Sequence, residues 1–119
     1  MRIFKTKWFA REASSHGISD DELYQAIQSA LQGKVVDLGG GVYKKRLNKN
    51  RDRALILTKS AEYWLYTFLY AKQDMTNINH RELMGFRELA KHYANLSEEK
   101  TTALVKSKEL VEICDDSKK

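Results

Sequence analysis

Six basic side chains stand within twelve residues near the middle of the chain, directly after three consecutive glycines, Gly39 to Gly41. The six are Lys44, Lys45, Arg46, Lys49, Arg51 and Arg53, and within this stretch only Asp52 opposes them. Clustered cations bind phosphate groups, so the stretch predicts a surface for a polyanion, and RNA is the polyanion that we expect. Such a cluster can also stabilise negative charge that develops on a phosphate, and it can lower the pKa of a lysine enough for that lysine to act as a base.

Aromatic residues follow this basic stretch. A short apolar run, Ala54 to Thr58, precedes an aromatic segment that extends from Tyr63 to Lys72. A cationic strand beside aromatic strands is typical of an RNA-binding surface. A solvated sheet edge is the structural alternative, because natural sheets often protect their edges with Lys and Arg.

The charge of the chain is concentrated in one region. The net charge is +5, whereas residues 34–59 alone hold eight basic and two acidic residues, a net +6. A localised excess of this kind steers an anionic partner to one face of a protein. With 119 residues and a hydrophobic share of 42%, the chain can form one domain with a real core. We expect this domain at residues 1–113, followed by a polar tail at 114–119.

Several classes of protein are excluded by what the sequence lacks. The single cysteine, Cys114, cannot form an internal disulfide, and no Cys/His cluster has metal-ligand spacing. The basic N-terminus is not followed by the apolar region of a signal peptide. The longest apolar run, Tyr63 to Ala71, is about half as long as a bilayer requires. We therefore expect a cytoplasmic protein that does not enter a membrane.

The first third of the chain predicts a strand and two helices. Residues 2–6 suit a strand, and residues 8–13 suit a short helix that Gly17 terminates. Ser19 and Glu22 have the spacing of a capping box, in which each side chain accepts a hydrogen bond from the backbone amide of the other residue. Apolar residues at helical spacing follow, and Gly33 ends this second helix.

Residues 35–47 predict a strand that is interrupted at the three glycines. Consecutive glycines indicate a bulge or a close backbone approach. A phosphate-binding nest is an alternative, but the spacing and the following helix of a P-loop are absent. In a regular strand Val42, Lys44 and Arg46 share one face, and Lys45 lies on the other.

Two turns, at residues 48–52 and 59–62, predict an antiparallel meander of three strands. Regular alternation places Arg53 on the same face as Leu55 and Leu57. In the last strand it places one set of side chains together: Trp64, Tyr66, Phe68, Tyr70 and Lys72. Neither face of that strand is polar, so we expect it in the centre of the sheet.

Helix signals return in the last third of the chain. Asn79 and Glu82 have capping-box spacing, and apolar residues line one face of the helix that follows them. Ser97 precedes a further short helix, and residues 110–113 suit a final strand. The chain therefore predicts an α+β fold in which two N-terminal helices and a C-terminal helix pack on a small, mainly antiparallel sheet.

The order of these elements, together with six motifs, resembles the toxins of RelE/HigB type in the RelE/ParE superfamily of bacterial toxin–antitoxin systems. The motifs are RIFKTKWFAR, GISDDELYQAI, DLGGGVYKKR, FLYAK, NINHRELMGFRELAK and LVEI. The resemblance runs from residue 1 to residue 113 and implies a RelE-like fold. It implies an endoribonuclease that cuts messenger RNA in the ribosomal decoding site and uses no metal or other cofactor. It also implies a cognate antitoxin, commonly a small helix-turn-helix protein of HigA type.

The resemblance assigns roles to single residues. Lys44, Lys45 and Arg46 occupy the family's basic strand, and Arg53 falls where relatives place an arginine at the start of the next strand. Tyr70 and Lys72 lie at the rim of the family's active site. The catalytic residues implied are Lys44, Lys45, Arg53, Tyr70 and Lys72, and the RNA-binding residues implied are Arg46, Lys49 and Arg51.

Other roles for these residues stay open. Lys44 and Lys45 could serve only to bind phosphate, and Tyr70 could be a core residue, since tyrosine packs well in strands. A non-catalytic module that binds RNA or an antitoxin is an alternative function. A gyrase poison of ParE type is another, although the dense basic strand favours a ribonuclease.

The sequence also departs from the family pattern. Relatives usually have a glycine-rich turn before their arginine, so Arg51 could be the counterpart in place of Arg53. An ion pair of Arg53 with Asp52 or Glu62 is a structural alternative. The histidines fall in or beside helices, which argues against a histidine acid–base mechanism unless His80 folds back toward the sheet.

Overall fold

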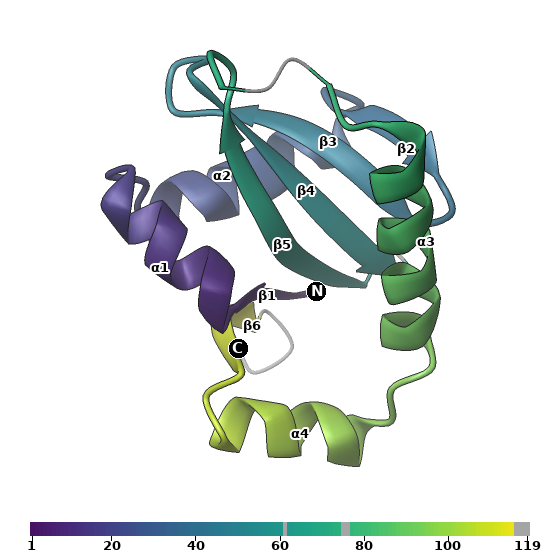
Figure 1. Cartoon of the computed structure of the whole chain (residues 1–119). Helices are drawn as coiled ribbons and strands as arrows, with labels where there is room; N and C mark the ends of the chain where they lie inside the picture. The colour runs from purple at the N-terminus through teal and green to yellow at the C-terminus, as the bar shows by residue number, and fades with distance from the viewer. Residues whose placement is uncertain (61, 75–76, 116–119) are drawn as a thin grey trace.

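The computed structural model describes residues 1–60, 62–74 and 77–115, and these form a six-stranded sheet with helices on both faces (Figure 1). The strands are β1 (Arg2–Thr6), β2 (Val36–Gly39), β3 (Val42–Leu47), β4 (Asp52–Lys59), β5 (Tyr63–Ala71) and β6 (Leu110–Asp115). They lie in the order β2–β3–β4–β5–β1–β6, and every neighbouring pair is antiparallel except β1 with β5. The predicted meander, β3–β4–β5, and the central place of β5 are confirmed.

The helices divide the core into two parts. α1 (Lys7–Ser15) and α2 (Asp20–Leu31) cover one face of the sheet, and α3 (His80–Ala94) covers the other (Figure 1). α4 (Glu98–Lys106) packs beside β6. Because strand side chains alternate between faces, each face has its own apolar cluster. Phe9, Ile27 and Ile56 belong to the α1/α2 side, and Val42 and Leu57 belong to the α3 side. The predicted α+β fold is confirmed.

Three glycines turn the chain between β2 and β3, and all have positive φ angles: 85° at Gly39, 65° at Gly40 and 82° at Gly41. A Cβ atom on Gly40 would lie 2.7 Å from Cγ of Arg87 on α3. The Arg87 guanidinium donates hydrogen bonds to the carbonyl oxygens of Gly39 and Leu38. The close approach predicted from the glycines is therefore confirmed, and the element that approaches is α3.

Polar caps begin the helices where the sequence predicts them. The Ser19 hydroxyl accepts a hydrogen bond from the amide of Glu22, and Asn79 and Glu82 form a complete capping box. The Glu22 carboxylate differs from the prediction, because it accepts from the backbone amide of Asn48 at 2.6 Å. Since Asn48 lies in the turn between β3 and β4, α2 holds that turn in place.

A bulge in β5 changes which aromatic residues face which helices. Consecutive residues of β4 pair with Tyr66 and Phe68, so Thr67 is an additional residue in β5. Trp64 and Tyr66 lie in the α1/α2-side core, whereas Phe68 contacts Phe86 of α3. The sequence predicts that one face of this strand holds Trp64, Tyr66, Phe68, Tyr70 and Lys72. That prediction is wrong, because the extra residue in β5 interrupts the strict alternation of its side chains.

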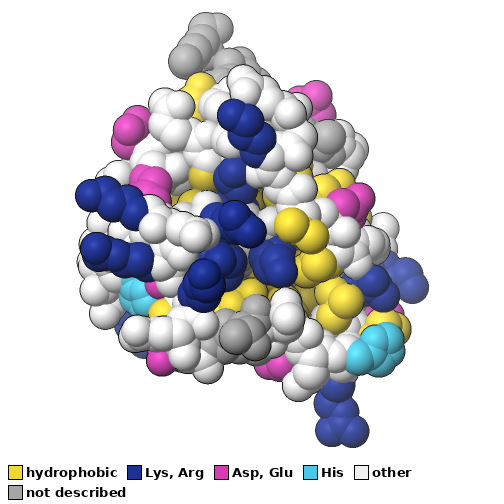
Figure 2. Space-filling model, turned by 90° about the horizontal axis from the view of Figure 1, so that it is seen from above, with side chains coloured by type: hydrophobic (Ala, Val, Ile, Leu, Met, Phe, Trp, Pro, Cys, Tyr) yellow, Lys and Arg dark blue, Asp and Glu magenta, His cyan; other side chains and the backbone are white. Residues whose placement is uncertain are grey.

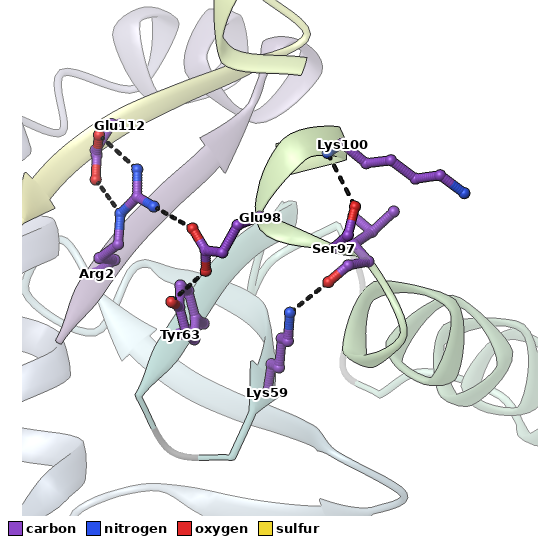
Figure 3. Close-up of polar contacts among 8 residues, drawn as sticks. Arg2, Lys59, Tyr63, Ser97, Glu98, Lys100 and Glu112 are labelled. Atoms are coloured by element: carbon purple, nitrogen blue, oxygen red, sulfur yellow. Dashed lines mark hydrogen bonds and ion pairs between the residues drawn. The ribbon is translucent and has the colours of Figure 1, made fainter. Parts of the chain in front are cut away.

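Polar side chains of β1, β4 and β5 contact α4 or the segment just before it, and Arg2 of β1 also contacts β6 (Figure 3). Arg2 of β1 pairs with Glu98 at the start of α4 at 3.2 Å, and with Glu112 of β6 at 2.7 Å. The Tyr63 hydroxyl of β5 donates to Glu98, and Lys59 of β4 donates to a backbone carbonyl just before α4. The segment that follows α3 is thus held against β1, β4 and β5 by these hydrogen bonds and ion pairs.

β6 extends to Asp115, two residues beyond the predicted strand. The remainder of the predicted tail, residues 116–119, and Ala61 of the predicted 59–62 turn lie outside the described residues. Among the described residues, no helix has both the length and the apolar character needed to cross a membrane.

Candidate nucleic-acid interface

Basic and aromatic side chains gather on the α3 side of the sheet, where β3 and β5 end. In one row across the sheet, Arg46 of β3 pairs with Arg53 of β4, and Arg53 pairs with Tyr70 of β5. Lys44 lies two residues before Arg46, on the same face of β3. We call Lys44, Arg46 and Arg53 the cationic cluster. Figure 2 looks onto this end of the molecule and shows Lys and Arg side chains gathered at its middle, beside hydrophobic ones.

The cationic cluster has no acidic partner among the described residues. Lys44 is half-buried and Arg46 is exposed, and neither forms a hydrogen bond or ion pair with a described residue. Arg53 is 8% exposed, and its Nη1 atom donates to the backbone carbonyl oxygens of Asn50 and Asp52, both at 3.1 Å. The alternative ion pair of Arg53 with a carboxylate is therefore not formed. Carbonyl oxygens orient the guanidinium without cancelling its charge, so the cluster stays attractive to an anion.

Tyr70 brings a buried hydroxyl group to the cationic cluster. The residue is 6% exposed, and its hydroxyl has no hydrogen-bond partner among the described residues. Burial raises the pKa of Tyr70, and the nearby Arg53 charge acts in the opposite direction. The phenol is therefore protonated near neutral pH and can donate a hydrogen bond. A buried donor without a partner is costly, and a ligand oxygen would relieve that cost.

Lys45 lies on the opposite face from the cationic cluster. Its ammonium group donates to the Ser29 hydroxyl of α2 at 2.9 Å and to the backbone carbonyl of Lys34 at 2.6 Å. Burial lowers the pKa of Lys45, and the charges of Lys34 and Arg46 add to that effect. A lowered pKa favours a lysine as a base, but the lysine that has it, Lys45, faces α2. The structure does not bring Lys45 together with Arg53 and Tyr70.

The turn between β3 and β4 carries the remaining basic candidates. Lys49 is exposed at its tip, with a φ angle of 53°. Arg51 and Lys72 line a cavity of about 780 Å³ at the same end of the sheet. No member of the cationic cluster lines this cavity, whereas Lys49 lines a second pocket together with Arg46.

A histidine lies in that cavity, which the sequence reasoning missed. Nδ1 of His16, the residue that ends α1, lies 3.0 Å from Oδ1 of Asp52, and Asp52 is 2% exposed. The Asn48 side chain donates to the other Asp52 oxygen at 2.9 Å. The position of His16 at a helix end gives no signal that it meets a turn more than thirty residues later. No group of three or more His, Cys, Asp or Glu side chains among the described residues could hold a metal ion.

A protein-family model described as the RelE toxin of the RelE / RelB toxin-antitoxin system matches residues 1–113. The chain belongs to the RelE toxin family. No curated protein and no solved structure matches it. As a RelE-family protein it is the toxin of a toxin–antitoxin system, so a cognate antitoxin is its partner. The family match covers every element from β1 into β6, including the strands that carry the cationic cluster.

Proposed function

We propose that this RelE-family toxin is an endoribonuclease that cuts messenger RNA on the ribosome and thereby stops translation. The observation that carries the proposal is the meeting of Lys44, Arg46 and Arg53 with the unpartnered hydroxyl of Tyr70 on one face of the sheet. Three cations that have no acidic partner among the described residues suit a phosphodiester, and a buried donor suits one of its oxygens.

The proposed reaction needs no metal ion. The 2′-hydroxyl of the RNA attacks the adjacent phosphate, and negative charge builds up on the phosphate oxygens. Arg53 and Arg46 stabilise that charge, and Lys44 binds the same phosphate or its neighbour. Tyr70, which burial keeps protonated, donates a hydrogen bond to a phosphate oxygen or a proton to the leaving 5′-oxygen. Lys49, Arg51 and Lys72 bind flanking phosphates from the border of the site.

In this proposal the antitoxin is a small helix-turn-helix protein of HigA type, and the ribosome presents the message. Lys45, which faces α2, takes no part in the reaction. The general base is left to a group that the RNA or the ribosome brings near the cationic cluster.

Primer extension on a reporter message tests the proposal. The toxin is induced without its antitoxin, beside an Arg53→Ala variant and an Arg53→Lys variant that keeps a charge but loses the planar guanidinium. We expect cleavage within the reading frame that stops when translation is blocked. Arg53→Ala should reduce it by about 100-fold, the loss typical of one transition-state donor, and Arg53→Lys should reduce it less.

Two outcomes would contradict the proposal. Growth arrest with intact messages and a DNA-damage response would indicate a gyrase poison. Neither arrest nor cleavage, with antitoxin binding retained, would indicate a non-catalytic module. Circular dichroism of each variant separates a loss of activity from a loss of folding.

A further inference from the structure

An exposed tryptophan is connected to the cationic cluster through aromatic residues of β5. Trp8, in the first turn of α1, is 42% exposed and stacks on Phe68, with ring centroids 5.3 Å apart and planes 15° from parallel. Phe68 contacts Phe86 of α3 at 5.6 Å and Tyr70 at 5.9 Å. These rings form one continuous set. We call Trp8, Phe68 and Phe86 the aromatic platform.

The topology of the sheet explains how α1 brings a ring to this place. β1 accompanies β5 only as far as the pair Lys5 and Tyr66. The chain then enters α1, so at Phe68 the edge of β5 opposite β4 has no strand beside it among the described residues and receives the ring of Trp8 instead. The core does not bury this ring, since much of it stays in contact with water. A large exposed ring beside a charged site marks a candidate binding surface.

We propose that the aromatic platform binds a nucleobase of the RNA whose phosphates contact the cationic cluster. This inference rests on the proposed function and adds the way in which the substrate is held. Neighbouring strands lie about 5 Å apart, so Phe68 and Tyr70 on β5 lie one strand away from Arg53 on β4 and two strands away from Lys44 and Arg46 on β3. A nucleotide likewise presents a flat apolar base next to a charged phosphate.

A general binding mode and one further observation favour single-stranded RNA as the occupant. Unpaired bases stack on aromatic side chains while basic residues follow the backbone, which is the usual way in which proteins bind single strands. Tyr70 contacts Phe68 of the platform and pairs with Arg53, and its buried hydroxyl, which has no partner among the described residues, can donate to the sugar–phosphate that joins the two. A purely apolar partner would leave this donor and the cationic cluster unpaired.

Fluorescence of Trp8 tests the proposal directly. The chain has two tryptophans, and Trp64 is 4% exposed in the core. In a Trp64→Phe variant, Trp8 is therefore the fluorescence reporter. If Trp64→Phe impairs folding, calorimetric titrations of the protein without this substitution provide a second measurement of binding. The probes are a 2′-O-methyl trinucleotide, whose blocked hydroxyl prevents cleavage, and the same trinucleotide with an abasic centre.

We expect the complete trinucleotide to quench Trp8 and to bind about 10- to 100-fold more tightly than the abasic one, as the loss of one stacked base predicts. Trp8→Leu should bring the affinity for the complete trinucleotide down to that for the abasic one, and leave abasic binding unchanged. Leu31→Ala, which removes a comparably exposed apolar side chain from the end of α2, is the matched control and should change neither.

The outcomes separate this inference from the proposed function. If Arg46→Ala weakens both trinucleotides while Trp8→Leu changes neither, the base platform is overturned and the RNA surface stands. If neither trinucleotide binds and messages are also uncut in cells, both fail together. If Trp8→Leu leaves RNA binding intact but prevents neutralisation by the antitoxin, the platform belongs to the protein partner and the inference is overturned.

Discussion

Polar side chains on the two faces of the sheet differ in how many have partners among the described residues. On the α1/α2 side, the Lys45 ammonium, the Asp52 carboxylate and the Tyr66 hydroxyl all have partners within the protein. On the α3 side, Lys44 and Arg46 have no partner among the described residues, and the Tyr70 hydroxyl is buried without one. Lys44 and Lys45 are consecutive in one strand, so strand alternation alone separates these two conditions.

This difference teaches that residue type does not identify the site. Satisfied polar groups stabilise a fold, whereas an unsatisfied buried group costs stability that a ligand can restore, and unpaired cations at the surface remain available to an anion. The α1/α2 side therefore positions the turn between β3 and β4, and the α3 side is the face that we expect to bind RNA. Substitutions on the two faces should affect different measurements.

Among the substitutions that compare the two faces, Tyr70→Phe should reduce RNA cleavage most, although it changes the structure little. It removes only the unpartnered hydroxyl, so cleavage should fall by about 100-fold while the melting temperature stays the same or rises. Single-turnover cleavage and thermal melting of the same preparation check both parts. Unchanged cleavage would place the hydroxyl outside the reaction.

Asp52→Ala should show the reverse pattern. The substitution leaves the His16 and Asn48 side chains without their buried acceptor, which should cost about 2 kcal/mol of unfolding free energy. Cleavage should remain within a few-fold of wild type at a temperature where the variant is folded. Urea denaturation gives the stability, and a loss of cleavage in the folded variant would show that this side also serves the chemistry.

Tyr66→Phe sharpens the comparison between two tyrosines of one strand. The Tyr66 hydroxyl is fully buried and donates to the carbonyl oxygen of Leu23 in α2 at 2.7 Å. Its removal should cost about 1 kcal/mol of unfolding free energy and leave cleavage unchanged. If Tyr66→Phe reduced cleavage as much as Tyr70→Phe, the assignment of the two faces would fail.

Local signals predicted most of this fold. Helix caps at Ser19 and Asn79, the glycines between β2 and β3, and the two turns of the meander act over a few residues, and each lies where the sequence placed it. The bulge at Thr67 has no such signal, since Thr is an ordinary strand residue, and it separated Phe68 and Tyr70 from Trp64 and Tyr66.

The candidate site could be predicted only in part. Alternation along β3 placed Lys44 and Arg46 on one face and Lys45 on the other, because that strand is regular, whereas the pairing of Arg46 with Arg53 depends on the register between β3 and β4. The contact between His16 and Asp52 depends on how α1 docks against a distant turn, which no short pattern encodes. The predicted hydrogen bond from the Ser19 amide to the Glu22 carboxylate depends on tertiary structure in the same way. The carboxylate accepts instead from the backbone amide of Asn48, which is distant in the sequence.

The most direct test of the account compares neighbouring cations of β3. Lys44→Ala, Lys45→Ala and Arg46→Ala each remove one charge from the same strand, and translation-dependent cleavage of one message is measured for all three. The account predicts that Lys44→Ala and Arg46→Ala each lower the cleavage rate by about tenfold or more, while Lys45→Ala stays close to wild type. A loss in Lys45→Ala equal to the other two, with folding intact, would contradict the assignment of the α3 side as the face that cuts RNA.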